Sequence, residues 1–150
     1  MSEIARIQDQ LKRAFEGGAW HGPSVKEVLA GVNAAKADSR PIPGAHSIRE
    51  IVPHIDAWQN GVRLAIEGEE VELSNEEDWP AQNEKTEAAW NQAINTLENG
   101  HRLLQISIGK LSNDDLERIP KGSKSTIYVL LHGVIQHHLF HAGQIAMLKK

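Results

Sequence analysis

The sequence predicts an all-α fold, a four-helix bundle with short extra helices in its connectors, and three observations support this prediction. Apolar residues recur every three or four positions through four long segments, as on the buried face of an amphipathic helix. Ser-x-x-Glu capping boxes stand where two of the helices should begin, at Ser24 and Ser47. Glycine and proline interrupt the apolar pattern between these segments. No β-sheet is expected.

The first half of the chain should contain two of the long helices. The first is expected over residues 2–17, where two glycines end it. A short helix should follow Ser24, and residues 37–45 include Arg-Pro-Ile-Pro-Gly, which must be a connector. The second long helix is expected over residues 47–66. Pro53 lies inside it on the side away from the apolar stripe, so a kink is expected there.

The second half should supply the other two. Residues 67–78 are acidic and lack an apolar rhythm, which predicts an exposed loop ending at Trp79-Pro80. The third long helix is expected over residues 81–110, and Ser112 should begin a single helical turn. The fourth is expected over residues 126–149. Without an internal repeat or low-complexity segment, residues 1–150 are expected to form a single domain.

The composition excludes several functional classes. The 16 basic and 20 acidic residues are spread along the chain without a basic stripe, so no nucleic-acid or membrane partner is expected. The absence of cysteine excludes disulfides, thiolate zinc sites and a cysteine nucleophile. The N-terminus has no apolar targeting segment, and no apolar run approaches the ~18 residues of a membrane span. A cytoplasmic protein is therefore expected.

Histidines are concentrated in the last predicted helix. Four of the eight in the chain fall within ten residues: His132, His137, His138 and His141. His137 and His141 lie one turn apart and roughly 40° around the axis, within reach of one metal ion. A zinc-protease motif would place Glu after the first of these, where this chain has His138. His138 and His141, three residues apart, could also chelate, and periodicity alone does not choose between the two pairs.

A three-histidine site needs one ligand from another segment, and His54 is the best candidate. It lies at the edge of the apolar stripe in the second long helix, beside the proline. His132 is expected on the surface, and His101 at a seam position is more typical of a hydrogen-bonded core residue. His21 and His46 lie in connectors and could line a pocket mouth.

Three stretches carry a family resemblance: Ser47-Ile-Arg-Glu-Ile-Val-Pro-His-Ile-Asp-Ala-Trp58, the downstream His137-x-x-x-His141-Ala-Gly-Gln-Ile, and the early Trp20-His-Gly-Pro-Ser-Val. In this order they resemble the DinB/YfiT-like superfamily of metalloenzymes over nearly the whole chain. The resemblance implies a four-helix bundle with a divalent metal on His54, His137 and His141, which favours His137 over His138. Two positions depart from the family pattern: Ile48, where many relatives carry Trp, and His138, where a different polar residue is usual.

The resemblance also implies an activity. Some members are thiol-S-transferases that use low-molecular-weight thiols such as bacillithiol or mycothiol, and others are grouped with hydrolases or isomerases. We therefore expect a metal-dependent enzyme that acts on a small molecule, of the thiol-S-transferase or hydrolase type. Zinc or nickel is the expected ion, with iron and manganese as alternatives. Gln144, Asp56, Trp58 and His21 are candidates for hydrogen bonds to the ligands.

The alternative is a non-catalytic stress-response or interaction bundle whose metal is structural. Structural zinc sites usually have four protein ligands, so this alternative would gain from a fourth ligand supplied by His138, His101 or His21. Small bundles with exposed apolar helix flanks often pair, and the sequence leaves a homodimer open.

Overall fold

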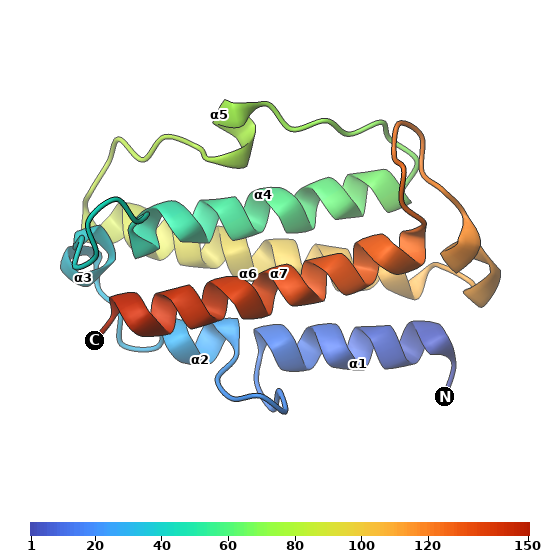
Figure 1. The fold of residues 1–150 in the computed structure, drawn as a ribbon, viewed down its shortest axis with the longest axis horizontal. Coiled ribbons are helices and arrows are strands. Elements are labelled where there is room, and N and C mark those ends of the chain that lie inside the picture. Colours follow the sequence, from blue (N-terminus) through green and yellow to red (C-terminus); the bar gives the residue numbers. More distant parts are fainter.

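The computed structural model describes all residues, Met1–Lys150, and contains helices but no strands. Its four long helices are α1 (Glu3–Phe15), α4 (Ile48–Ile66), α6 (Glu87–Gly109) and α7 (Ile127–Leu148) (Figure 1). The connectors contain α2 (Val25–Leu29), α3 (Ala34–Asp38), α5 (Asn75–Asp78) and the 3₁₀ helix η1 (Asn113–Glu117). The predicted all-α bundle with short extra helices is confirmed.

Helix α7 is the element that most of the others contact. It packs against α4 on one side and against α1 and α2 on the other, where these two helices follow each other along its length (Figure 1). Helix α6 packs against both α4 and α1. The long helices therefore form a ring in the order α4, α6, α1, α7. Helix α3 packs against α4 and α6 at the end of the bundle near the C-terminus (Figure 1).

Side-chain caps fix where the helices begin. The hydroxyls of Ser2, Ser24, Ser47 and Thr126 each accept a hydrogen bond from the backbone N–H three residues later. At Ser24 and Ser47 the third helical residue is a glutamate that returns a bond to the serine backbone, which completes both predicted capping boxes. Helix α1 ends just before Gly17, as the glycine pair predicts.

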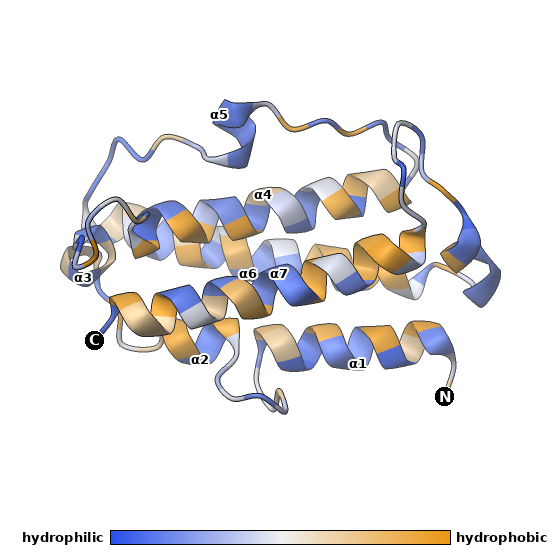
Figure 2. Cartoon of the chain, viewed as in Figure 1, coloured by the Kyte–Doolittle hydropathy of each residue, from blue (hydrophilic) through white to orange (hydrophobic).

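Apolar and polar residues alternate along the long helices, as amphipathic helices require (Figure 2). The buried apolar side chains form two separate clusters. One cluster lies around α2, α3 and the last turns of α7, and includes Phe15, Ile51, Leu97 and Ile145. The other lies around α1 and the first turns of α7, and includes Leu11, Val62, Leu104 and Leu131. Burial of this surface supplies the main stabilisation of the bundle.

Buried polar side chains lie between these two clusters. On α6, the buried His101 stands between Leu97 of one cluster and Leu104 of the other. On α7, the buried His138 and His141 occupy the interval between the two apolar stretches, and on α4 the buried Gln59 does so. The bundle thus contains a polar layer across its middle, and most of the histidines belong to it.

One predicted boundary and one predicted loop are wrong. The third long helix begins at Glu87 and not at residue 81, because the Thr86 hydroxyl accepts from the Ala89 N–H and fixes the start there. The preceding residues are not helical, and the Glu84 carbonyl accepts from the Arg49 guanidinium. The predicted exposed loop over residues 67–78 contains the one-turn helix α5.

Helix α5 begins at a third capping box, in which Ser74 and Glu77 bond each other's backbone N–H groups. Its last residue, Asp78, and the following Trp79 are both half-buried. This connector therefore returns to the bundle and lies against α4 before α6 begins.

Helix α4 continues without interruption through Pro53. At the sixth residue of a helix, proline removes a single backbone hydrogen bond, and the apolar face of α4 remains continuous on either side. None of the helices in the bundle combines the length and the apolarity that a membrane-spanning segment requires.

Candidate metal centre

Three histidines from two helices meet in the polar layer. His54 comes from α4, and His137 and His141 come from successive turns of α7. Helices α4 and α7 pack against each other, which brings the three imidazoles together. One ring nitrogen from each lies within 4.8 Å of the others, and no further His, Asp or Glu belongs to the group.

The Nε2 atoms point at one another. The Nε2 of His137 lies 3.1 Å from the Nε2 of His54 and 3.1 Å from the Nε2 of His141. Two nitrogens that each lie about 2.1 Å from one ion at a tetrahedral angle are roughly 3.4 Å apart. The observed separations are therefore close to those of nitrogens that share an ion.

The opposite nitrogens of two of these rings are held by oxygen atoms. His54 Nδ1 lies 2.7 Å from the backbone carbonyl oxygen of Asp78 and 3.0 Å from its carboxylate. His141 Nδ1 lies 2.7 Å from the amide oxygen of Gln144. Oxygen acceptors place the proton on Nδ1, so the Nε2 of each neutral ring carries a free lone pair.

The three Nε2 atoms have too few protons among them for each to form a hydrogen bond. His137 Nε2 faces two lone pairs, those of His54 and His141, and it has at most one proton to donate. Its own Nδ1 is buried without a hydrogen-bond partner. At least one buried lone pair of the group thus has no donor, which is unfavourable in the absence of a positive ion. A divalent ion among the three Nε2 atoms would satisfy all of them.

Protonation of the imidazoles does not replace such an ion at neutral pH. Burial, and after it the adjacent His141 and His54 rings, which disfavour a second charge, together lower the pKa of His137 to about 3. Burial also lowers the pKa of His141. These two imidazoles are consequently neutral at pH 7, which is the form that ligates metals.

The sequence profile of the DinB superfamily matches residues 19–145, which include all three histidines and most of the chain. The chain belongs to the DinB superfamily. No curated protein and no solved structure shows significant similarity to it. Membership in this family and the three-histidine group are both compatible with metal binding.

Two residues of this DinB-superfamily site were not predicted from the sequence, Asp78 and Trp79. Asp78 accepts from the His54 ring, and its carboxylate also accepts from the Trp58 indole N–H at 2.6 Å. The Trp79 indole stacks on His54, with ring centroids 3.7 Å apart and planes at 4°. The Ser74-x-x-Glu77 capping box was the available signal that this connector folds, although it does not show where the connector packs.

Trp79 is held between two imidazoles. Its ring lies 3.6 Å from that of His46 at 11° and 3.7 Å from that of His54 at 4°. Two rings parallel to the indole and this close to its centroid cannot share a face, so His46 and His54 lie on opposite faces. His46 is further held by a hydrogen bond of 2.9 Å to Glu50. His46 therefore does line the site, at the outer side of Trp79.

His138 lies on a different face of α7 from the other two histidines, toward Phe15 of α1. It is completely buried, and both of its ring nitrogens lack a hydrogen-bond partner. Its ring packs at a tilt against Phe15 of α1, at 5.6 Å between centroids, and the same phenyl ring stacks on His101 of α6 at 4.1 Å. The structure thus places His137, and not His138, with His54 and His141.

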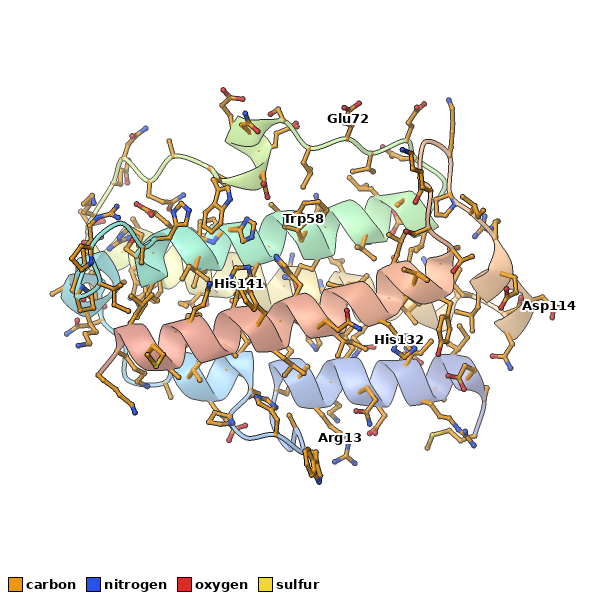
Figure 3. The ribbon with its side chains drawn as sticks, viewed as in Figure 1. Arg13, Trp58, Glu72, Asp114, His132 and His141 are labelled. Atoms are coloured by element: carbon orange, nitrogen blue, oxygen red, sulfur yellow. The ribbon has the colours of Figure 1, made fainter.

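The remaining candidates are distributed through the molecule. Gln144 contacts His141 as expected, and the ring centroids of Trp58 and His137 are 6.1 Å apart. Figure 3 labels Trp58 on α4 and His141 on α7. Asp56 instead faces α6, where it accepts from Gln59, and burial raises the pKa of its carboxyl. His21 is exposed and outside the group.

His132 is half-buried, although the sequence suggested a solvated surface position. His132 lies more than two turns before His141 on α7 (Figure 3), and its ring packs at a tilt of 46° against that of Tyr128, with centroids 4.4 Å apart. His101 is buried as predicted, but its ring nitrogens make no hydrogen bond with good geometry. A carboxylate oxygen of Glu16 lies 3.4 Å from His101 Nε2.

Proposed function

We propose that the chain binds one divalent metal ion through His54, His137 and His141 and acts as a metal-dependent enzyme on a small molecule. The reaction would be of the thiol-S-transferase or hydrolase type. Zinc or nickel is the expected ion, since all-imidazole sites suit both, and iron or manganese are alternatives.

The observation that carries this proposal is the convergence of three Nε2 lone pairs with too few protons to satisfy them. The Nδ1 atoms of His54 and His141 are already committed to oxygen acceptors, at 2.7 Å in each case. Such partners fix the orientation of ligand imidazoles and raise their basicity. The donor set is thus oriented for an ion.

Three ligands favour a catalytic over a structural role. Structural zinc sites usually close with four protein ligands, whereas catalytic sites keep one position open. None of the sequence candidates for a fourth ligand, His138, His101 and His21, belongs to the group. An ion held by three neutral imidazoles would keep its full charge and act as a Lewis acid toward a donor atom of the substrate.

The chain's own residues would orient the site and limit its access to water. Asp78 holds the His54 ring by its Nδ1, and Gln144 does the same for His141. Trp79 covers one face of His54. His54 and His141 are only 5% and 4% exposed, so water has little access to these ligands.

Metal analysis of protein purified without chelator, paired with a thiol-conjugation assay, tests the proposal. We expect close to one divalent ion per chain, and conjugation of a low-molecular-weight thiol that stops when the ion is removed and resumes when it is restored. Protein that neither retains nor takes up zinc or nickel would refute metal binding. A loaded protein without thiol transfer would leave the hydrolase type to be assayed next.

A further inference from the structure

A cavity of about 380 Å³ opens beside the three-histidine group. It shares two residues with the metal centre, His141 and Gln144, and Trp79 also forms part of its wall. Its other walls come from three separate segments, the connector before α4, α4 itself and the last turns of α7. Its volume lies at the small end of the range of small-molecule sites, about 300–1,000 Å³.

The lining of this cavity is mainly apolar. Seven of its ten residues are apolar, namely Ile42, Ala45, Ile51, Trp79, Phe140, Met147 and Leu148, and the other three are His46, His141 and Gln144. No lysine, arginine, aspartate or glutamate lines it. The His46 imidazole in the lining is already engaged by the Glu50 carboxylate, which also pairs with Arg40. A carboxylate placed here would lose its hydration without gaining a charged partner, which is strongly unfavourable.

Two of these side chains are unusually exposed for apolar residues. Phe140 is 64% exposed and Met147 is 63% exposed, and both lie on the outward side of α7 at the rim of the cavity. An apolar ligand in the cavity would cover part of this surface and would gain hydrophobic free energy in proportion to the area removed from water.

We infer that this cavity binds the apolar, uncharged arm of the small-molecule substrate, while a donor atom of the substrate reaches the three-histidine group. This inference rests on the proposed function for the donor atom, but the apolar contacts do not require an ion. The expected substrates are molecules with an alkyl or aromatic arm, and thiols that carry a carboxylate on that arm should bind less tightly.

The two methionines of the chain provide a direct probe. Met147 lines the cavity, whereas Met1 lies at the N-terminus at the other end of the bundle (Figure 1). Protein labelled with ¹³C-methyl methionine therefore reports on the cavity and carries an internal reference. The full chain, zinc-loaded and metal-free, would be titrated with n-alkanethiols from ethanethiol to hexanethiol and with 6-mercaptohexanoate.

We expect the Met147 signal of the zinc-loaded protein to shift saturably while the Met1 signal stays fixed. Affinity should rise roughly fourfold for each added methylene until the cavity is filled. The carboxylate of 6-mercaptohexanoate should cancel most of this gain. Phe140→Ser should weaken the dependence on chain length. Val129→Ser is the matched control, because Val129 is an exposed apolar residue of α7 that does not line the cavity.

Three results would overturn the inference: a Met147 signal unmoved by bound hexanethiol, an affinity independent of chain length, or equal binding of the mercapto acid. A Met147 signal that changes with protein concentration instead of ligand would assign the surface to a second copy of the chain. Failure to bind zinc would count against the proposed function alone, since hexanethiol can still be titrated into metal-free protein to test the cavity.

Discussion

Helix α7 presents buried imidazoles on two sides, and the two sides differ in what the ring nitrogens meet. On the side of α4, His137 and His141 meet His54, and oxygen atoms hold the outer nitrogens of two rings. On the side of α1 and α6, His138 lies near His101, and none of their ring nitrogens makes a hydrogen bond.

Burial and stacking do not account for the difference. On the first side His54 stacks on Trp79 at 3.7 Å, and on the second His101 stacks on Phe15 at 4.1 Å. Burial lowers the pKa of an imidazole on each side, to about 3 for both His137 and His138. What separates them is the convergence of Nε2 lone pairs and the oxygen acceptors behind them. These features make the first side compatible with a bound cation, and the second side lacks them.

The largest expected difference is in metal affinity, between variants of two residues that are adjacent in the sequence, His137 and His138. Loss of a group that hydrogen-bonds to a metal ligand typically reduces metal affinity by roughly 10–100-fold. His137→Ala removes a ligand itself, so it should reduce metal affinity by more than that, and His54→Ala and His141→Ala should do the same. His138→Ala should retain its metal and lose only stability, because it removes a completely buried ring. Competition titration with a metal-binding dye measures the affinities. A metal-free His138→Ala protein alongside a loaded His137→Ala protein would reverse the assignment.

The next effect concerns stability in acid. The pKa of His138 is about 3 in the folded chain, against an ordinary value of 6.5 that applies after unfolding. As the pH falls, the unfolded chain binds a proton at this histidine before the folded chain does. The free energy of unfolding therefore has its full value above pH 6.5 and decreases as the pH falls toward 3. The loss is about 1.4 kcal/mol per pH unit, or roughly 2 kcal/mol at pH 5.

Urea unfolding of the metal-free protein at pH 7 and pH 5 measures this loss. His138→Leu removes the buried titrating group, so the difference between the two pH values should shrink by roughly the same 2 kcal/mol. An unchanged difference in this variant would mean that the imidazoles on the α4 side and the other titrating groups carry the whole effect.

Much of the fold was predictable because local signals determine it. Caps at Ser24 and Ser47 and the glycines after α1 fixed boundaries, and apolar periodicity identified the long helices. The late start of α6 was missed because residues 81–86 have no feature that forbids a helix. Their extended path depends on tertiary contacts such as that between Arg49 and Glu84.

The site was predictable in part for the same reason. Helical geometry placed His137 and His141 on one flank of the helix. It did not exclude His138 as a ligand, because His137 and His138 lie on either side of the apolar stripe and both are near the core. Only the packing of α4 against α7 decides which one meets His54. Asp78 and Trp79 approach His54 from a connector more than 20 residues downstream, and no local pattern predicts such a contact.

A smaller effect tests the oxygen acceptors that distinguish the two sides. Asp78→Ala should remove the carboxylate from His54 Nδ1 and from the Trp58 indole, while the backbone carbonyl at 2.7 Å remains. Because one acceptor survives, we expect the low end of the usual range, about a tenfold loss of metal affinity. Glu76→Gln is the control, since Glu76 is exposed on the same helical turn. A loss as large as that of His54→Ala would mean that the whole connector had moved.

The smallest expected effect tests whether stacking matters to the metal centre. Trp79→Leu would remove the indole from His54 and leave both oxygen contacts of Asp78 in place. An aromatic pair is worth about 0.5–1.5 kcal/mol beyond its buried area, so metal affinity should fall by roughly two- to tenfold. His46→Ala removes the ring on the far face of the same indole and should change metal affinity less, because His46 does not contact His54 through any other group. If Trp79→Leu instead abolished metal binding, stacking would be essential to the orientation of His54.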